Sequence, residues 1–478
     1  MTLRIMLALS LVAATPVLAQ PAPKQPAPKQ PAPKQPAPAA APAPADDMAA
    51  FDHDLDALFA AAGLTSDQAA ARAGGASPAV RRRAAEIEAA IAQAEAAELT
   101  RVPQVSAKLS YTRLSPVDSK LMFAGMNIEF PSLTNAYLAE AQLVVPLSDY
   151  LLRYPKLIEA ARLGVEAARL GKRSSEVTAG QDARLTYYEW VRAQLQVLIS
   201  KRQLLQVQRT LDQVRALAEV QRLSRADLLR VESQEAEAEQ VVDRLANLAQ
   251  LREEQLRLLI GAAATEPLVV GEDIRADVAG AGAAALDELT ATATRQRLEL
   301  KAIDIGLQAK DSQRAAEQAN RWPRLSAFAV ADHAKPNQRV FPQQDEFNLT
   351  WSVGAQLTWT LNDALLSRTT DRRIRAEADG LRADRENLER GTRIEVLAAQ
   401  QAVVIAQHAL ATSQKGLTAA EEGYRVRKEL LNADRATAVE LVDAETELTR
   451  SRIRALDARV DLRVARAQLA HALGNDTK

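Results

Sequence analysis

The chain has 478 residues, a length that at the usual size of a domain would predict about three globular domains. Only 4% of the residues are aromatic while 25% are charged, and this composition is typical of long helices that pack through alanine and leucine rather than of several compact cores. The formal net charge of -1 gives no electrostatic reason to bind nucleic acid, and the lack of cysteine excludes disulfides, thiolate metal sites and a catalytic thiol.

The N-terminal part of the chain carries an export signal followed by a low-complexity linker. Residues 1–19 combine Arg4, an apolar run and a small final residue, which predicts a secretory signal peptide cleaved after Ala19. Residues 20–46 repeat the pentapeptide PAPKQ and then alternate proline with alanine, a pattern typical of an extended, solvated tether. Contact of its lysines with cell-wall polymer or anionic lipid is the alternative. No later stretch of about 18 consecutive apolar residues predicts a membrane-spanning helix.

The remainder of the sequence is duplicated. Gln255–Gly261 returns as Gln468–Gly474, and Asp227–Glu232 returns as Glu440–Glu445, both at an offset of 213 residues. Two further segments upstream recur in the same order, and self-similarity of this kind indicates a repeated structural unit. We therefore predict a first repeat over residues 47–261, a linker over 262–285 and a second repeat over 286–474.

Each half contains two strand-like segments. Phe347–Leu361 alternates apolar and polar residues without a break, and Val105–Thr112 does the same. The predicted strands cover residues 103–113, 135–147, 323–332 and 347–361. Strands with one apolar face and aromatics near their ends suit a lipid-facing barrel wall around a polar lumen, and a soluble sandwich is the alternative. Because a barrel needs about eight strands to close, several chains would have to share one.

A long helix and a shorter return helix follow each pair of strands. The long helices are predicted over residues 148–222 and 362–431, with Ser148 and Asn362 as N-caps. The return helices are predicted over residues 224–261 and 434–473, with Gly261 and Gly474 at their ends. A helix of roughly 70 residues is about 100 Å long, so Ser77–Thr100 and Leu286–Ala319 are expected to extend the shorter partners coaxially. The segments Ser115–Pro131 and Lys335–Glu346 are expected to be loops.

These features together resemble the TolC-like outer-membrane efflux protein family. The resemblance is carried by the signal peptide, the two tandem halves and the turn-proximal segments Leu223–Leu229 and Thr437–Ala444, and it covers residues 75–474. It implies a mainly α fold with a small β part, in which a homotrimer forms an α-helical periplasmic barrel continued by a shared twelve-stranded outer-membrane β-barrel. It also implies the outer membrane of a Gram-negative bacterium as the location, with a large periplasmic part and contact with outer-membrane lipid.

The function implied by the resemblance is that of the outer-membrane channel of a tripartite efflux or type I secretion system. Such a channel is a passive conduit that receives substrates from a periplasmic adaptor (membrane fusion) protein and an inner-membrane pump. In this family, acidic residues just after the second tip turn form the narrow entrance, and the matching positions here are Glu440 and Asp443, with Asp227 equivalent to Glu440 in the first repeat. Their i, i+3 spacing places Glu440 and Asp443 on one helix face. An exposed helical charge pair is the alternative interpretation.

The turns at the two helical tips are the candidate contacts with the adaptor. The resemblance implies Leu223 and Ser224 in the first repeat and Asp434 and Arg435 in the second. Members of the family commonly have glycine in this turn, whereas Gln221 and its neighbours stand there in this chain.

Other classes of function have less support in the sequence. We find no phosphate-binding glycine loop, HExxH motif or nucleophile elbow, so we expect no enzyme, no cofactor and no metal site. The aromatic cluster Tyr187, Tyr188 and Trp190 is interpreted as packing. An exported coiled-coil scaffold or adhesin without a pore is the alternative function, but it does not explain amphipathic strands at equivalent positions in both halves. A periplasmic adaptor would need a lipoyl-like β domain and usually has one hairpin.

Overall fold

The computed structural model describes residues 53–116, 119–123, 126–130, 133–221, 223–276, 285–433 and 435–477. The expected signal peptide and the PAPKQ linker lie outside the described residues. All elements described below belong to one unit of the chain, Met48–Lys478.

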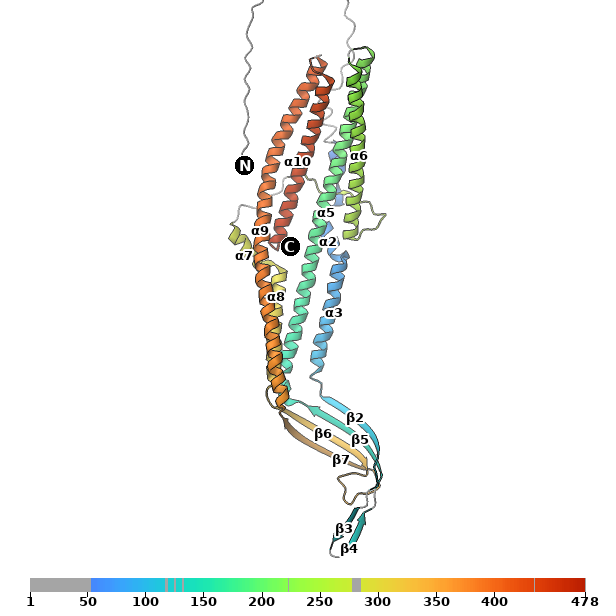
Figure 1. The fold of residues 1–478 in the computed structure, drawn as a ribbon, viewed down its shortest axis with the longest axis vertical. Helices are drawn as coiled ribbons and strands as arrows, with labels where there is room; N and C mark the ends of the chain where they lie inside the picture. The colour runs from blue at the N-terminus through green and yellow to red at the C-terminus, as the bar shows by residue number, and fades with distance from the viewer. Residues whose placement is uncertain are drawn as a thin grey trace, which may run out of the picture. The chain divides into compact units, whose positions relative to one another are not determined.

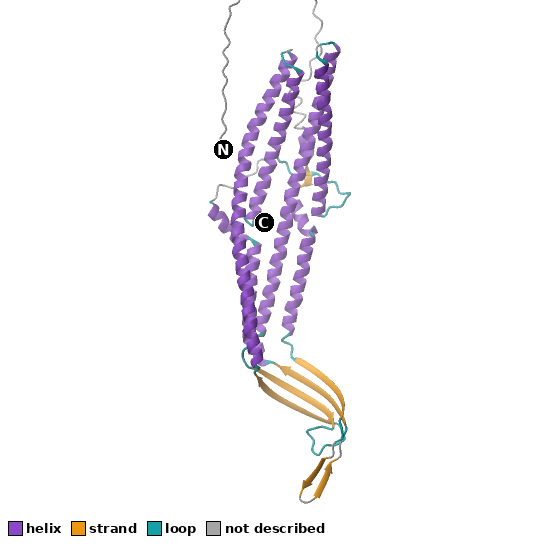
Figure 2. Ribbon diagram, viewed as in Figure 1, coloured by secondary structure: helices purple, strands orange, loops and turns teal. Residues whose placement is uncertain are grey.

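The main described elements follow the same order in the two halves, two helices, two long strands, a long helix and a return helix, and the long strands lie at one end of the helices (Figures 1 and 2). The first half contains β1 (Phe59–Leu64), α2 (Ser66–Ala76), α3 (Pro78–Leu99), β2 (Gln104–Arg113), β3 (Ser119–Phe123), β4 (Met126–Phe130), β5 (Asn135–Val145), α4 (Leu147–Leu152), α5 (Tyr154–Glu219) and α6 (Arg225–Ile260). The second contains α7 (Leu286–Gln296), α8 (Leu298–Ala319), β6 (Arg324–Lys335), β7 (Asn348–Thr358), α9 (Leu361–Asn432), α10 (Ala438–Ala472) and the short 3-10 turn η1 (Asn475–Thr477).

The two longest helices are α5 and α9, and two shorter helices pack end to end along each of them. Away from the sheet, α6 packs on α5 and α10 packs on α9; towards the sheet, α3 packs on α5 and α8 packs on α9 (Figure 1). The helices α8 and α10 also contact α5, so the two repeats are joined along their length. The expectation that segments preceding the strands extend the return helices is confirmed for α3 and α8. Leu286–Gln296 differs and forms the separate helix α7, because the backbone leaves the helical conformation at Arg297.

The four longer strands form one antiparallel sheet in the order β2-β5-β6-β7. Val105 pairs with Leu143, and Leu325 pairs with Leu357. Successive side chains of a strand point to opposite faces, so this register gathers the odd-numbered residues of all four strands on one face. Large exposed residues on that face are Val105, Leu109, Tyr111, Tyr137, Leu143, Leu325, Leu349, Trp351, Val353 and Leu357. The period-two pattern therefore predicts the sheet correctly, including its apolar face.

The opposite face of the sheet is mainly polar. Lys108, Glu140 and Asp332 stand opposite one another across β2, β5 and β6. One aromatic residue interrupts the polar face: the ring of Phe328 lies over Gly354 on β7, where an added Cβ would approach the ring to 2.7 Å. Gly354 is therefore required by a close contact and not by a turn.

The helical tips and ends are built from the same local devices in both repeats. Ser224 and Thr437 are N-caps of α6 and α10, and each begins a capping box in which side chain and backbone bond reciprocally. Gly261 and Gly474 have left-handed backbone angles, with φ of 66° and 72°, directly after these helices. Glycine adopts this conformation at little cost, which confirms both as helix-ending residues.

The predicted N-caps of the long helices are wrong. The helices α4 and α9 begin at Leu147 and Leu361, their caps make no side-chain hydrogen bond, and Ser148 and Asn362 lie inside the first turn. The residues before these helices, Pro146 and Thr360, occupy the cap positions. Ser148 Oγ instead accepts a hydrogen bond of 3.2 Å from the backbone N–H of Leu325 at the start of β6.

The long helix predicted over residues 148–222 is interrupted near its start. It separates into α4 and α5 at Arg153, and Pro155 occupies the first turn of α5. Proline lacks the N–H that would continue α4 and is tolerated at the start of a helix, which explains the break. In the second repeat Thr369 stands at the corresponding position, and α9 is continuous.

Two small β elements were missed in the sequence. Residues 115–131, expected as a loop, contain the β3-β4 hairpin. Val270, in the expected linker, forms parallel bridges with β1 at Phe59 and Leu64. The contact is close: an added Cβ at Gly63 would lie 2.6 Å from the backbone N of Gly271. Only glycine fits there, so the linker is tied to the first repeat.

The largest core cluster lies where α2, α5, α6 and α10 meet. Tyr187 and Trp190 are fully buried and pack with Leu256 of α6 and Val460 of α10. The rings of Tyr187 and Trp190 meet edge to face, with centroids 5.9 Å apart. The interpretation of this aromatic cluster as packing is confirmed.

Candidate functional site: the two helical tips

The tip of the first repeat is a tight turn closed by a capping box. After α5 ends at Glu219, Gln221 adopts a left-handed conformation with φ of 58°, an uncommon state for a residue with a side chain. Ser224 Oγ then accepts a hydrogen bond of 3.2 Å from Asp227 N, and Asp227 Oδ2 accepts from Ser224 N at 3.3 Å and from Ser224 Oγ at 2.6 Å. The Asp227 carboxylate thus satisfies the free donors at the start of α6.

The tip of the second repeat is built in the same way. Thr437 Oγ1 accepts a hydrogen bond of 3.3 Å from Glu440 N, and a Glu440 carboxylate oxygen accepts one of 3.0 Å from Thr437 N. Arg435 N donates to Leu430 O at 2.8 Å, which ends α9. Asp434 lies outside the described residues. Glu440 is exposed, and its carboxylate is anchored by the backbone of its own turn.

Asp443 lies one turn further along α10, on the same face as Glu440. Its carboxylate is 4.0 Å from a guanidinium nitrogen of Arg230 on α6, so an ion pair connects the tips of the two repeats. Both side chains are more than half exposed, at 63% and 56%. Exposed pairs of this kind contribute little to stability, about 0–1 kcal/mol.

Apolar clusters anchor both tips just behind these carboxylates. Leu223 and Leu228 pack on a buried cluster of Leu211, Val214, Val231 and Val442, which brings α5, α6 and α10 together. Leu223 is therefore half-buried, whereas Ser224 and Arg435 are exposed. At the second tip, Leu431 packs on the buried cluster of Tyr424, Leu441 and Leu448.

A buried polar group next to the tips was missed in the sequence. Glu445, on α10, is only 5% exposed and accepts hydrogen bonds from Thr210 Oγ1 at 3.1 Å and from Gln206 Nε2 at 3.4 Å, both on α5. Gln206 also contacts the hydroxyl of Tyr424 on α9. Glu445 therefore links α10 to α5 directly and to α9 through Gln206. The available signal was a glutamate between Leu441 and Leu448, within the apolar stripe of α10.

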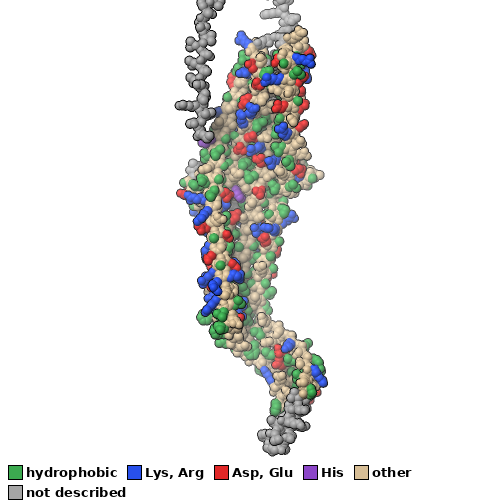
Figure 3. Space-filling model, in the orientation of Figure 1, with side chains coloured by type: hydrophobic (Ala, Val, Ile, Leu, Met, Phe, Trp, Pro, Cys, Tyr) green, Lys and Arg blue, Asp and Glu red, His purple; other side chains and the backbone are tan. Residues whose placement is uncertain are grey.

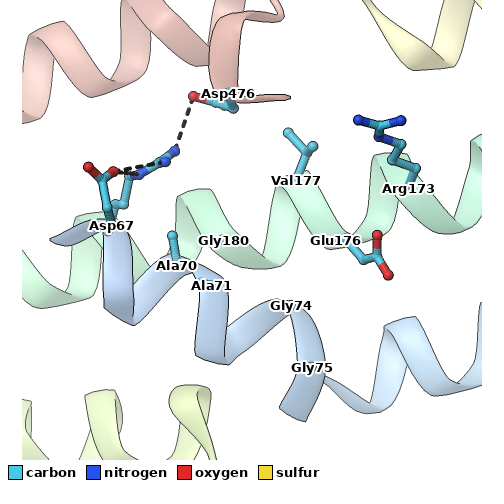
Figure 4. A pocket seen from close by; sticks show the side chains of 11 residues that line it. Asp67, Ala70, Ala71, Gly74, Gly75, Arg173, Glu176, Val177, Gly180 and Asp476 are labelled. Atoms are coloured by element: carbon cyan, nitrogen blue, oxygen red, sulfur yellow. Dashed lines mark hydrogen bonds and ion pairs between the residues drawn. The ribbon is translucent and has the colours of Figure 1, made fainter. Parts of the chain in front are cut away.

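A pocket lies at mid-length of the helices, between α2 and α5 (Figure 4). It has a volume of about 570 Å³, and three of its lining residues, Gly74, Gly75 and Gly180, have no side chain that would fill it. At one end the Arg184 guanidinium lies 3.1 Å from both Asp67 and Asp476. This arrangement attaches the C-terminal residues to the first repeat, so its charges already have protein partners.

A cluster of one aspartate and three arginines lies close to the sheet, between α8 and α9. Asp371 is buried and pairs with Arg314 at 2.8 Å, Arg321 at 2.9 Å and Arg375 at 3.3 Å. Burial by itself would raise the pKa of this carboxyl, but hydrogen bonds from Arg314, Gln318 and Arg321 outweigh it and lower the pKa to about 2. The carboxylate is therefore charged at every physiological pH and fixes the start of α9.

Comparison with solved structures relates this fold to outer-membrane channels. The chain superposes on CusC with a TM-score of 0.70 at 16% identity, covering 87% of this chain and 93% of that one. It superposes on the outer-membrane channel OprN with a TM-score of 0.69 at 19% identity, covering 92% and 98% of the two chains. VceC, an outer-membrane protein of Vibrio cholerae, gives 0.68 at 14% identity, with 89% and 96% covered.

Sequence comparison adds nothing to this relation. No family model matches the chain, and no curated protein matches its sequence significantly. The fold is therefore established by structure alone: a helical body and a small sheet arranged as in these outer-membrane channels.

Proposed function

We propose that this chain is the outer-membrane channel of a tripartite efflux or type I secretion system in a Gram-negative bacterium. It would act as a passive homotrimeric conduit that receives substrates through a periplasmic adaptor and an inner-membrane pump. The observation that carries the proposal is the four-stranded sheet, which has one apolar and one polar face and continues directly into a long helical body. Its likeness to solved outer-membrane channels supports the same assignment.

The open edges of this sheet support the homotrimer. Among the described strands, β2 and β7 each have one neighbour only, so each leaves a row of backbone donors and acceptors without strand partners. Within a bilayer such groups have no water to bond, and a closed barrel is the arrangement that satisfies them. Three copies would supply twelve strands, a permissible size for a barrel of the outer membrane.

Exposed apolar residues on α9 support the same assembly. Among the described helices, only α9 meets the length and hydropathy expected of a membrane span, over Leu361–Leu431, with a mean hydropathy of 1.3 in its most apolar window. Only 17% of that window is buried within the chain. Its exposed apolar residues include Ile394, Leu397 and Val404, which recur at helical spacing. Because α9 already packs on α8 and α10, we assign this stripe to contact with a neighbouring copy.

We further propose that Glu440 and Asp443 form the narrow entrance of the conduit. Both are exposed and share one face of α10, so a trimer would present two stacked rings of three carboxylates, which attract cations. The long, exposed contact between Asp443 and Arg230 gives a weak link between the tips that can separate when they realign. Asp227 would stabilise the tip of the first repeat as a capping residue.

The adaptor contacts proposed at the tips are Leu223, Ser224, Asp434 and Arg435. Ser224 and Arg435 are exposed and available to a partner. Leu223 packs inward, and its part would be to hold the turn in shape.

Single-channel conductance of the purified protein in planar bilayers tests the conduit and the entrance separately. We expect stable pores, and we expect the variant Glu440→Ala with Asp443→Ala to have altered conductance and weaker cation preference. The matched control is Asp379→Ala with Glu386→Ala, which removes two exposed carboxylates from α9, away from the tips. Pores indifferent to the tip variant would refute the entrance only. Well-folded protein that forms no pores would refute the conduit and favour the scaffold alternative.

A further inference from the structure

The junction between the sheet and α9 exposes a band of aromatic and aliphatic side chains. Trp322, just before β6, is 67% exposed, and Trp359, just after β7, is 58% exposed. The indole of Trp359 donates a hydrogen bond of 3.3 Å to Arg321 O, which holds the ring at the junction. Leu361 and Leu365 continue the exposed apolar surface into the first turns of α9. Tryptophan at such a position suits the boundary between hydrocarbon and water.

Two arginines follow these residues on the same side of α9. Leu361, Leu365, Arg368 and Arg372 are spaced by four, three and four residues, so they form one stripe along the helix. Both arginines are exposed. Arg368 lies about 5 Å and Arg372 about 10 Å beyond Leu365 along the axis, at 1.5 Å per residue. Figure 3 shows Lys and Arg side chains gathered over this part of α9, above the sheet.

The acidic groups of this region are engaged elsewhere. Asp371 faces the interior and pairs with the three arginines named above. Glu377 pairs with Lys310 at 2.7 Å and with Arg373 at 2.5 Å. Within the described part of the chain, Arg368 and Arg372 have no carboxylate partner, so the two guanidinium groups are available to an anion.

The first repeat does not carry the same stripe, although its backbone follows the same course. At the positions of Leu361, Leu365, Arg368 and Arg372 it has Leu147, Leu151, Tyr154 and Ile158, so the leucines recur and the arginines do not. Tyr154 and Ile158 are buried and uncharged, so neither could bind an anion as a guanidinium would. The positions of the two tryptophans are taken by Val102 and Val145. The combination of tryptophan, leucine and unpaired arginine is thus specific to the second repeat and is not a by-product of the duplicated architecture.

We propose that this stripe binds the phosphate of an anionic phospholipid in the periplasm-facing leaflet of the membrane. The inference rests on the proposed function, because it requires the sheet to lie in the bilayer and the helices to leave it. Each interfacial zone of a bilayer is about 5–8 Å thick. With Leu365 at its inner boundary, Arg368 lies about 5 Å further on among the head groups, and the long side chain of Arg372, about 10 Å further on, points back along the helix towards them. Guanidinium groups bind phosphate through paired hydrogen bonds and retain their charge there.

The test is lipid binding to the detergent-solubilised full chain by native mass spectrometry, with phosphatidylglycerol and phosphatidylethanolamine of identical acyl chains. The test variant is Arg368→Gln with Arg372→Gln. The matched control is Arg382→Gln with Arg390→Gln, which removes the same charge from α9 at arginines already paired with Asp379 and Glu386. An arginine near an anionic surface contributes about 1 kcal/mol, so the preference for phosphatidylglycerol should fall about fivefold per arginine in the test variant and stay unchanged in the control.

Inorganic phosphate is added as a competitor to separate a lipid site from a general anion site. Retention of phosphatidylglycerol in excess phosphate supports the proposal, and full displacement by phosphate would refute the lipid assignment. An unchanged lipid preference in the test variant would refute the role of the two arginines. Loss of the oligomer in that variant alone, seen by size-exclusion chromatography, would show that the stripe contacts another copy and would also refute the proposal. Pore formation by the same samples reports separately on the conduit.

Discussion

Replacing Asp371 with asparagine tests whether charge holds the start of α9 against α8. The carboxylate is 4% exposed and interacts with Arg314, Arg321 and Arg375 at distances of 2.8–3.3 Å. Asparagine has the same shape and can still accept the hydrogen bond from Gln318, but it brings no charge to the three guanidinium groups. The variant therefore removes electrostatics with little change in packing.

The pKa of Asp371 gives the size of the effect. A fall from 3.8 to about 2 corresponds to roughly 2.5 kcal/mol, at about 1.4 kcal/mol per unit. Arg375 is half-exposed, and solvent screens its share, so we expect Asp371→Asn to cost about 1–2 kcal/mol at pH 7. The folded-state pKa is depressed, so this stabilisation is complete above about pH 4, about half lost at pH 3 and absent once the pH falls well below 2.

Thermal unfolding followed by circular dichroism at pH 7, 5 and 3 measures the difference. For a chain of this length, about 1–2 kcal/mol lowers Tm by about 1–2 °C. The matched control is Asp379→Asn on the same helix, whose pair with Arg382 is exposed, and it should change Tm by a few tenths of a degree at most. If Asp371→Asn equals the wild type at pH 7, or loses the same amount at pH 7 and pH 3, the electrostatic explanation is wrong.

Three further substitutions test local features of the fold. Gln221→Gly should raise stability by about 0.5–1 kcal/mol, measured as Tm, because glycine relieves the left-handed backbone; a lower Tm would contradict this. Gly354→Ala should weaken the assembled oligomer in SDS electrophoresis, since its Cβ meets the ring of Phe328, and adding Phe328→Leu should restore it; an unaffected oligomer would contradict the close contact. Arg184→Ala should speed carboxypeptidase removal of the C-terminal residues, detected by mass spectrometry, because Asp476 keeps, among the described residues, only its contact with His471, within the same end of the chain; unchanged digestion would show that the Arg184 pair does not hold this end.

Much of the fold could be predicted because its determinants are local and repeated. The alternation of side chains predicts the sheet, and the offset of 213 residues predicts paired helix ends at Gly261 and Gly474. The predicted N-caps at Ser148 and Asn362 failed because a residue with capping chemistry acts as a cap only if the preceding backbone leaves the helix there. At these two points the backbone is already helical, because the helices begin at Leu147 and Leu361.

The tip carboxylates show what sequence reasoning could and could not give. The pattern of serine or threonine followed three residues later by an acid was visible at Ser224 and Thr437, and it would have predicted the capping roles of Asp227 and Glu440. The pairing of Arg230 with Asp443 spans two repeats, so no local pattern could have identified it. The same holds for Glu445, whose hydrogen-bond donors lie on α5, more than 200 residues away along the chain.

The break at Arg153 makes the two connections that lead from a strand into a helix mechanically unequal. In the first repeat, α4 and α5 meet at a point where the continuous backbone ladder is interrupted, so the chain can bend there at small cost. In the second, α9 passes the equivalent level without interruption and is braced by the salt bridges of Asp371. Of these two connections, the one through α4 can therefore bend and the one through α9 is rigid. If the sheet tilts, it would turn about the start of α9, and bending at Arg153 would take up the displacement.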